Sequence, residues 1–192
     1  MLLRTGAAAC AAIVLVLMSG CGSPPRESSR NGAVAADERP GVRDQRARLL
    51  FEKLKNLAGT WEASSTKGWA GTITYETIAG GSCVMEVDGV AHPESKMISI
   101  YAWDIDRIVL THYCAAKNHP RLVATEISDD ASRAVFTFID GTNLPSRDTG
   151  HMDSVVIQIK GPDEFTAQWS WYGAGKPDWM EEIRHTRVKT PG

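Results

Sequence analysis

A series of about ten short segments, in which apolar and polar residues alternate, runs through most of the chain. Alternation such as Phe136-Thr137-Phe138 places one face of a strand inside and the other outside. Turn residues such as Gly80-Gly81 separate the segments. They are 60–64, 71–79, 82–88, 96–104, 107–114, 121–128, 133–140, 151–160, 164–172 and 179–188. Because hairpin-linked strands remove their edges by closing, we predict an all-β fold, an antiparallel up-and-down β-barrel of about ten strands.

One amphipathic helix is expected before the strands, from Val42 to Leu57. Leucines such as Leu50 and Leu54 recur at three- and four-residue intervals among charged residues, and Gly59 ends the pattern. We interpret it as a helix that plugs or flanks the sheet. A helix lying on a membrane surface is the alternative.

The N-terminus is typical of an export signal. Arg4 precedes an apolar stretch that is too short for a permanent transmembrane helix. Met18-Ser19-Gly20-Cys21 resembles the lipobox of bacterial lipoproteins, in which the cysteine is acylated and becomes the mature N-terminus. We therefore expect residues 1–20 to be a signal peptide and Cys21 to carry a lipid anchor, with a plain cleaved signal as the alternative. Because Gly22 rather than aspartate follows, the resemblance implies a bacterial cell-envelope location at the outer membrane, facing the periplasm.

Two further regions follow the signal. Residues 21–44 contain the acylated cysteine and a Ser-, Pro-, Gly- and Arg-rich stretch without aromatic residues, which we expect to be a disordered tether. Residues 45–192 form the barrel domain. The formal net charge of the 192-residue chain is −2, so it lacks the basic surface that nucleic-acid binding requires. The partners expected are a lipid bilayer, through Cys21, and a small molecule.

The start of the barrel domain is similar to the opening of calycin barrels, the group that contains lipocalins and fatty-acid-binding proteins. The similarity rests on the pattern Phe-x-x-Leu-x-x-Leu-x-Gly-x-Trp between Phe51 and Trp61. It implies that a basic residue of the last strand, Arg184 or Arg187, packs over Trp61 and closes the base of the barrel through a cation–π contact worth ~1 kcal/mol.

Several runs resemble bacterial lipocalin-like domains of unassigned function. They are Leu110-Thr111-His112-Tyr113-Cys114, Asn118-His119-Pro120-Arg121, Gly150-His151-Met152 and Trp169-Ser170-Trp171-Tyr172. The neighbouring nitrobindins bind haem in a similar barrel, with a longer glycine-rich opening. In this chain Trp61-Glu62-Ala63-Ser64 stands at that place, so haem is disfavoured and no cofactor is predicted.

A candidate binding site follows from these runs. His112 shares a strand face with Leu110, so we expect it inside the barrel near one mouth, either bonded to a neighbouring strand or reaching a ligand. If the strand ends share one rim, His112, Arg121 and His151 form a polar cluster over an apolar cup. Such a cluster suits an anionic head group on an apolar tail, because Arg pairs with a carboxylate through two hydrogen bonds.

Aromatic and sulfur side chains extend this candidate site. Trp169 and Trp171 share one strand face and make a broad apolar wall, either of the core or of a binding cage. Cys83 and Cys114 remain after the signal is removed, and they either form a disulfide or stay free buried thiols. A nucleophilic Cys114 is the least favoured interpretation. No His-x-His or His-x-x-x-His pair is present, so no metal site is predicted.

Three functions remain open on the sequence. The first is binding of a small apolar or amphipathic molecule in the barrel, near His112, Cys114, Arg121, His151, Trp169 and Trp171. The second is a small barrel enzyme in which the two histidines and the arginine carry acid–base chemistry. The third is an envelope protein with a filled core.

Overall fold

The structure, a computed structural model, describes residues 40–189. The expected signal peptide, the lipidation site Cys21 and most of the expected tether lie outside the described residues. One α-helix, α1 (Gln45–Lys55), is followed by strands and one short 3-10 turn, η2 (Ala79–Gly81). The strands are β1 (Gly59–Ser65), β2 (Ala70–Ile78), β3 (Cys83–Asp88), β4 (Met97–Asp104), β5 (Arg107–Tyr113), β6 (His119–Ile127), β7 (Arg133–Thr142), β8 (His151–Gly161), β9 (Glu164–Gly173) and β10 (Lys176–Arg187).

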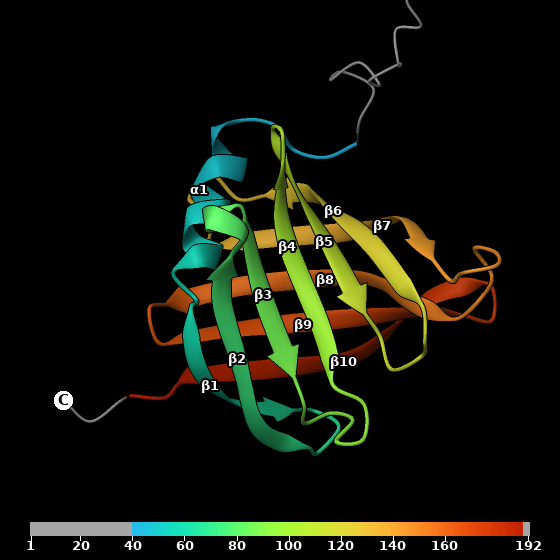
Figure 1. Ribbon diagram of the computed structural model, residues 1–192. Helices are drawn as coiled ribbons and strands as arrows, with labels where there is room; N and C mark the ends of the chain where they lie inside the picture. The colour runs from blue at the N-terminus through green and yellow to red at the C-terminus, as the bar shows by residue number, and fades with distance from the viewer. Residues whose placement is uncertain (1–39, 190–192) are drawn as a thin grey trace, which may run out of the picture. The chain divides into compact units, whose positions relative to one another are not determined.

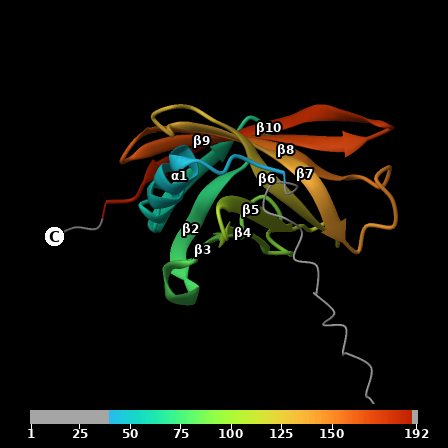
Figure 2. The same ribbon diagram turned by 90° about the horizontal axis from the view of Figure 1, so that it is seen from above.

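The strands form one closed barrel (Figures 1 and 2). Each strand pairs antiparallel with its neighbours in sequence, and β1 pairs with β10, for example Trp61 with Arg187. The prediction of an all-β, ten-stranded antiparallel barrel with one N-terminal helix is therefore confirmed. The strand ends differ from the predicted ones by a few residues, because ladder hydrogen bonds extend into the turns.

The helix is shorter than predicted and begins at Gln45 rather than Val42. Asp44 has an extended backbone, and its carboxylate accepts a hydrogen bond from the Arg46 amide at 2.9 Å, which caps the first turn. The Val42 amide instead donates to the Ala124 carbonyl at 2.8 Å. The residues before Asp44 therefore extend along β6 and do not form helix.

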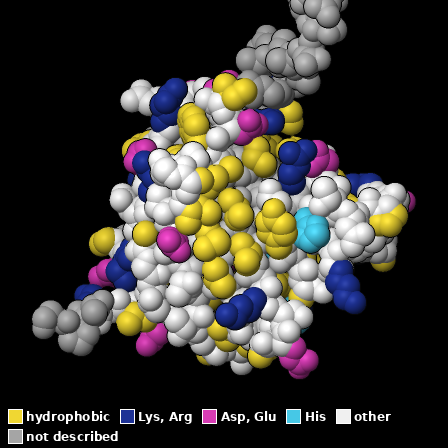
Figure 3. All heavy atoms as spheres, viewed as in Figure 1, with side chains coloured by type: hydrophobic (Ala, Val, Ile, Leu, Met, Phe, Trp, Pro, Cys, Tyr) yellow, Lys and Arg dark blue, Asp and Glu magenta, His cyan; other side chains and the backbone are white. Residues whose placement is uncertain are grey.

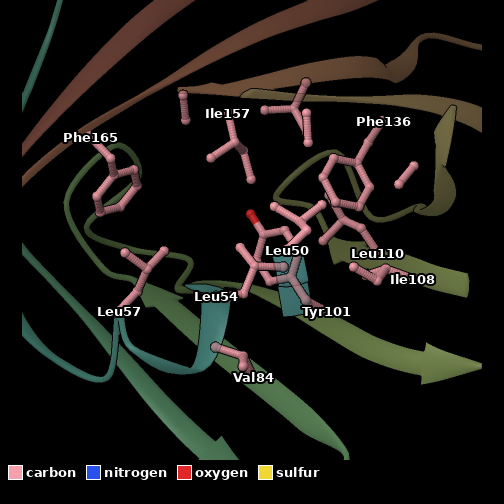
Figure 4. Packing of buried hydrophobic residues seen from close by; sticks show 14 of the residues in the cluster. Leu50, Leu54, Leu57, Val84, Tyr101, Ile108, Leu110, Phe136, Ile157 and Phe165 are labelled. Carbon is pink, nitrogen blue, oxygen red and sulfur yellow. The ribbon is translucent and has the colours of Figure 1, made fainter. Parts of the chain in front are cut away.

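Helix α1 covers one end of the barrel (Figure 1). Leu50 and Leu54 are fully buried and lie in one cluster with barrel residues such as Tyr101 and Ile157 (Figure 4). This burial confirms that α1 is a plug, and it places the apolar face of the helix in the core. The half of the interior next to α1 is therefore filled.

A cation–π contact closes the base of the barrel. The guanidinium carbon of Arg187 lies 4.2 Å from the centre of the Trp61 ring, and its nitrogens donate to the carbonyls of Asn56 and Ala58. The Trp61 indole donates to the Leu57 carbonyl at 2.8 Å. Arg187 is thus the basic residue that packs over Trp61, whereas Arg184 pairs with Glu164.

Strands β3 and β4 are unusual because several polar side chains point inward and several apolar ones point outward. Along β3, Glu86 and Asp88 are buried, while Met85 and Val87, which alternate with them, are partly exposed. Figure 3 shows hydrophobic side chains gathered on the outer face of this part of the sheet. The interior of the barrel is therefore polar on this side.

Candidate ligand cavity at the barrel mouth

A cavity of about 830 Å³ lies at the barrel mouth, the end opposite α1. The connections β1–β2, β3–β4 and β5–β6 surround it, together with the start of β8, the end of β9 and the first half of β10. We call it the mouth cavity, and its lining residues are Lys67, Ala91, His92, Pro93, Glu94, Ser95, Met97, Cys114, Ala115, Ala116, Met152, Trp171, Asp178, Trp179, Met180 and Glu181. Two smaller cavities, of about 360 and 640 Å³, border α1 and the loops beside it.

The wall of the mouth cavity is mainly apolar. Met97 and Met152 are buried side chains, and Trp171 extends the wall along β9. Trp171 also packs close to the backbone of Gly150 and Gly173, where an added Cβ would lie 2.6 Å and 3.0 Å from the indole. Glycine at these two positions therefore leaves room for the indole. Methionine and tryptophan provide an adaptable, polarizable surface for an apolar ligand.

A row of polar side chains crosses four adjacent strands beneath the mouth cavity. Tyr75, Glu86, Ser99 and His112 are successive cross-strand partners on β2, β3, β4 and β5, and we call them the polar row. Each of these side chains is buried. Cys114, which lines the cavity, lies two residues beyond His112 on the same face. The polar row therefore forms the layer directly below the cavity on this side of the barrel.

His112 holds one end of the polar row. Its Nδ1 lies 3.0 Å from the Ser99 hydroxyl, and its ring contacts Trp169, with centroids 5.0 Å apart. The other ring nitrogen, Nε2, is buried and has no hydrogen-bond partner. Burial lowers the pKa of His112 to about 4, so the ring is neutral at physiological pH. Nε2 is therefore an unsatisfied polar atom in the layer below the cavity.

Glu86 is the charged member of the polar row. The Tyr101 hydroxyl donates to its carboxylate at 3.3 Å, and Tyr75 and Ser99 also hydrogen-bond to it. Burial, and then the negative charge of Asp88, raise the pKa of Glu86 to about 7. Glu86 therefore changes its protonation near neutral pH, inside the barrel.

Two further acids are buried at the mouth. The carboxylate of Asp88 accepts hydrogen bonds from the amides of Val90 and Ala91, which hold the β3–β4 connection. The carboxylate of Glu181 accepts hydrogen bonds from the Ser65 hydroxyl and, at 2.9 Å, from the Trp69 indole. Glu181 lines the mouth cavity. We refer to Glu86, Asp88 and Glu181 as the three buried acids.

Four of the predicted site residues lie at or under the mouth cavity. Cys114 and Trp171 line it, and His112 and Trp169 lie in the layer below. The predicted cluster of His112 with Arg121 and His151 does not form. Arg121 points to the outside, where it pairs with Asp140, because Leu122 and Ala124 occupy the inward positions of β6.

His151 is buried away from the mouth cavity. Its ring packs between Phe138 and Tyr172, with centroids 4.5 Å and 5.4 Å away, and Arg147 contacts its Nε2. The reason is a β-bulge in β8 between Met152 and Ser154. The bulge shifts the alternation by one residue, so Met152 takes the inward position beside the mouth cavity and His151 does not join the expected rim cluster.

Cys83 and Cys114 are free thiols, so the predicted alternative of a disulfide between them is wrong for this structure. Cys83 on β3 pairs with Ala102 on β4, and Ala102 pairs with Val109 on β5. Cys114 lies five residues further along the chain than Val109. At the rise of a β-strand this is roughly 16 Å, well beyond disulfide reach. Burial raises the pKa of Cys114, so its thiol stays protonated and is a poor nucleophile.

The three buried acids and Tyr75 were missed as site residues. Met85 and Val87 share one face of β3, and alternation alone does not show whether that apolar face is inside or outside. In the structure the opposite face is inside. The one available signal was that Val84 shares its face with Glu86 and Asp88, which is a weak indication by itself.

No protein-family model matches the chain, and no curated protein matches it significantly. Within residues 40–189, no helix is both long and apolar enough to cross a membrane. In the same part of the chain, no three His, Cys, Asp or Glu side chains gather into a potential metal site.

Proposed function

We propose that this chain is a lipid-anchored binding protein, whose calycin-like, up-and-down barrel holds a small apolar or amphipathic molecule at its mouth. The observation that carries the proposal is the mouth cavity of about 830 Å³. This volume falls within the range of about 300–1,000 Å³ that small-molecule sites occupy. Its buried lining is mostly apolar, and the neighbouring polar row offers hydrogen bonds.

The packing of the interior supports a cavity at one end only. Side chains of α1 and of the strands fill the half of the barrel near Trp61 (Figure 4). A ligand therefore enters from the mouth and rests on the layer that contains His112 and Trp169. This arrangement favours a shallow site for one small molecule over a completely filled core.

The lipid anchor belongs to the proposal through the sequence around Cys21. An acylated Cys21 attaches the barrel to a bacterial envelope membrane, and Gly22 favours the outer membrane facing the periplasm. Metabolic labelling with a fatty acid tests the lipid anchor: the wild-type protein should incorporate the label, and a Cys21→Ser variant should not.

Binding without turnover agrees better with the geometry than acid–base catalysis does. The catalytic hypothesis needed His112, Arg121 and His151 together, but Arg121 pairs with Asp140 outside and His151 is enclosed by aromatic rings. Cys114 faces the cavity as a protonated thiol.

Thiol alkylation tests the proposed site, because the chain contains a matched control. Residues 40–189 lie in one compact unit. The polypeptide 36–192 that contains them, which we call the barrel unit, has two cysteines, Cys114 in the mouth cavity and Cys83 near the opposite end. Saturating decanol, a neutral amphiphile, is expected to slow alkylation of Cys114 by iodoacetamide about tenfold or more, because the ligand covers the thiol. Cys83 should react at its unliganded rate. Peptide mass spectrometry measures both rates, and equal protection of the two thiols, or of neither, would contradict the proposal.

A further inference from the structure

The charged groups around the mouth are unevenly distributed. The buried charged residues of the described chain are the three buried acids and Arg107. Arg107 lies at the α1 end, where it donates to the Pro40 carbonyl at 2.7 Å and to Asp104 at 2.8 Å. The cavity lining includes Lys67, but Lys67 is exposed at the rim. A molecule inside the cavity therefore meets the buried carboxyl group of Glu181, with Glu86 and Asp88 in the layer below it, and no buried cation among residues 40–189.

We propose that the mouth cavity selects amphipathic amines, molecules with an apolar body and a positively charged amino group. This inference rests on the proposed binding function and names its ligand class. Opposite charge attracts the ammonium group toward the three buried acids, and in a partly desolvated site the attraction is stronger than in water. The Trp171 ring in the cavity wall provides a π face that also favours a cation.

The unpartnered nitrogen of His112 is a second, independent indication. His112 is buried and neutral, and its Nδ1 is already bonded to Ser99. The Ser99 hydroxyl donates to the Glu86 carboxylate, so it accepts from the His112 Nδ1–H and leaves Nε2 as the acceptor nitrogen. An acceptor in this layer takes a hydrogen bond from the N–H of an amine that reaches it. A carboxylate has no proton to donate, and it would also be repelled by the buried acids. The site thus favours donors over acceptors.

The environment of Glu86 agrees with this selection. The groups that face it are Asp88, Tyr75, Tyr101 and Ser99, none of which is a cation. An ammonium group at the mouth would compensate the ionised form of Glu86. Amine binding at neutral pH is therefore expected to release protons from the protein, which calorimetry in buffers of different ionisation enthalpy detects.

Three ligands with the same ten-carbon tail test the inference: decylamine, decanol and decanoate. Each ligand is added to the barrel unit at increasing concentrations that stay below its aggregation concentration. The alkylation rate of Cys114 is measured at each concentration, with the rate of Cys83 as the internal control. Decylamine is expected to give half protection at a concentration about tenfold below that of decanol, and decanoate at a higher one. Decanoate acting as strongly as decylamine would overturn the charge inference alone. Protection of Cys114 by none of the three would overturn the binding function itself.

Substitutions of the buried acids test whether they cause the preference for an amine. At pH 8, above the pKa of Glu86, Glu86→Gln and Glu181→Gln each remove a negative charge with little change in volume, and each is expected to reduce the preference for decylamine over decanol about threefold or more. Glu62→Gln, at an exposed position of β1, is the matched control and should leave the preference unchanged. Because Glu181 also holds Ser65 and Trp69, Glu86→Gln provides the test if Glu181→Gln does not fold. An unchanged preference in the folded acid variants would overturn the assignment.

Discussion

Replacing Trp61 with alanine is expected to lower the free energy of unfolding by about 3–5 kcal/mol. Trp61 is fully buried and packs edge-to-face against Phe165, with ring centroids 4.8 Å apart. Its indole donates to the Leu57 carbonyl, and Arg187 covers its ring. The substitution thus removes a large side chain that joins α1, β1 and β10, and leaves a cavity at the base of the barrel.

Urea unfolding of the barrel unit measures this loss. Trp179→Ala is the matched control, because Trp179 is 56% exposed, and its effect should stay within about 0.5 kcal/mol. Trp61→Phe should give an intermediate loss, since it keeps an aromatic ring but not the indole hydrogen bond. A loss below about 1 kcal/mol for Trp61→Ala would show that the base of the barrel is not packed as described.

Glu86→Gln is expected to raise the free energy of unfolding above pH 7 by an amount on the order of 3 kcal/mol. The pKa of Glu86 is about 7 in the folded protein, against 4.5 for an ordinary glutamate, because the carboxyl group is buried. The folded state therefore holds a proton that the unfolded state loses. The wild-type protein consequently loses stability as the pH rises from 4.5 to 7, and the glutamine variant does not.

The difference between the two proteins, measured by urea unfolding at about pH 4 and about pH 8, isolates this effect. Burial lowers the pKa values of His112 and His185 to about 4, so both histidines destabilise the fold as the pH falls below 6.5. These contributions are present in both proteins and cancel in the difference. A difference that stays the same at both pH values would mean that folding does not raise the pKa of Glu86.

The barrel was predictable because the sequence signals for its strands and turns come from residues that are close together in the chain. Alternation and turn residues, such as Gly80-Gly81 before β3, are read from neighbouring residues, and antiparallel hairpins connect neighbouring segments. The plug helix was predictable for the same reason, from the spacing of Leu50 and Leu54. The first residue of the helix was not predictable. It is set by the Asp44 cap and by the hydrogen bond from the Val42 amide to β6, which depend on the folded structure.

The site was only partly predictable because it depends on which strand face is inside. His112 was placed correctly, since Leu110 on the same face is apolar and buried. His151 was not, because the bulge after Met152 changes the alternation, and a bulge leaves little trace in sequence. Glu86 was missed because both faces of β3 contain apolar residues, and only the closed barrel determines which face is inside.

The most direct test of the account is a ¹H–¹⁵N spectrum of the tryptophan indoles during titration of the barrel unit with decanol. The six tryptophans sample the whole barrel. Trp171 and Trp179 line the mouth cavity, whereas Trp61 and Trp103 lie near α1. Because decanol is expected to bind in the mouth cavity, the resonances of Trp171 and Trp179 should shift on binding and those of Trp61 and Trp103 should not. A shift confined to Trp103, beside the smaller cavity at α1, or no shift of any indole, would contradict it.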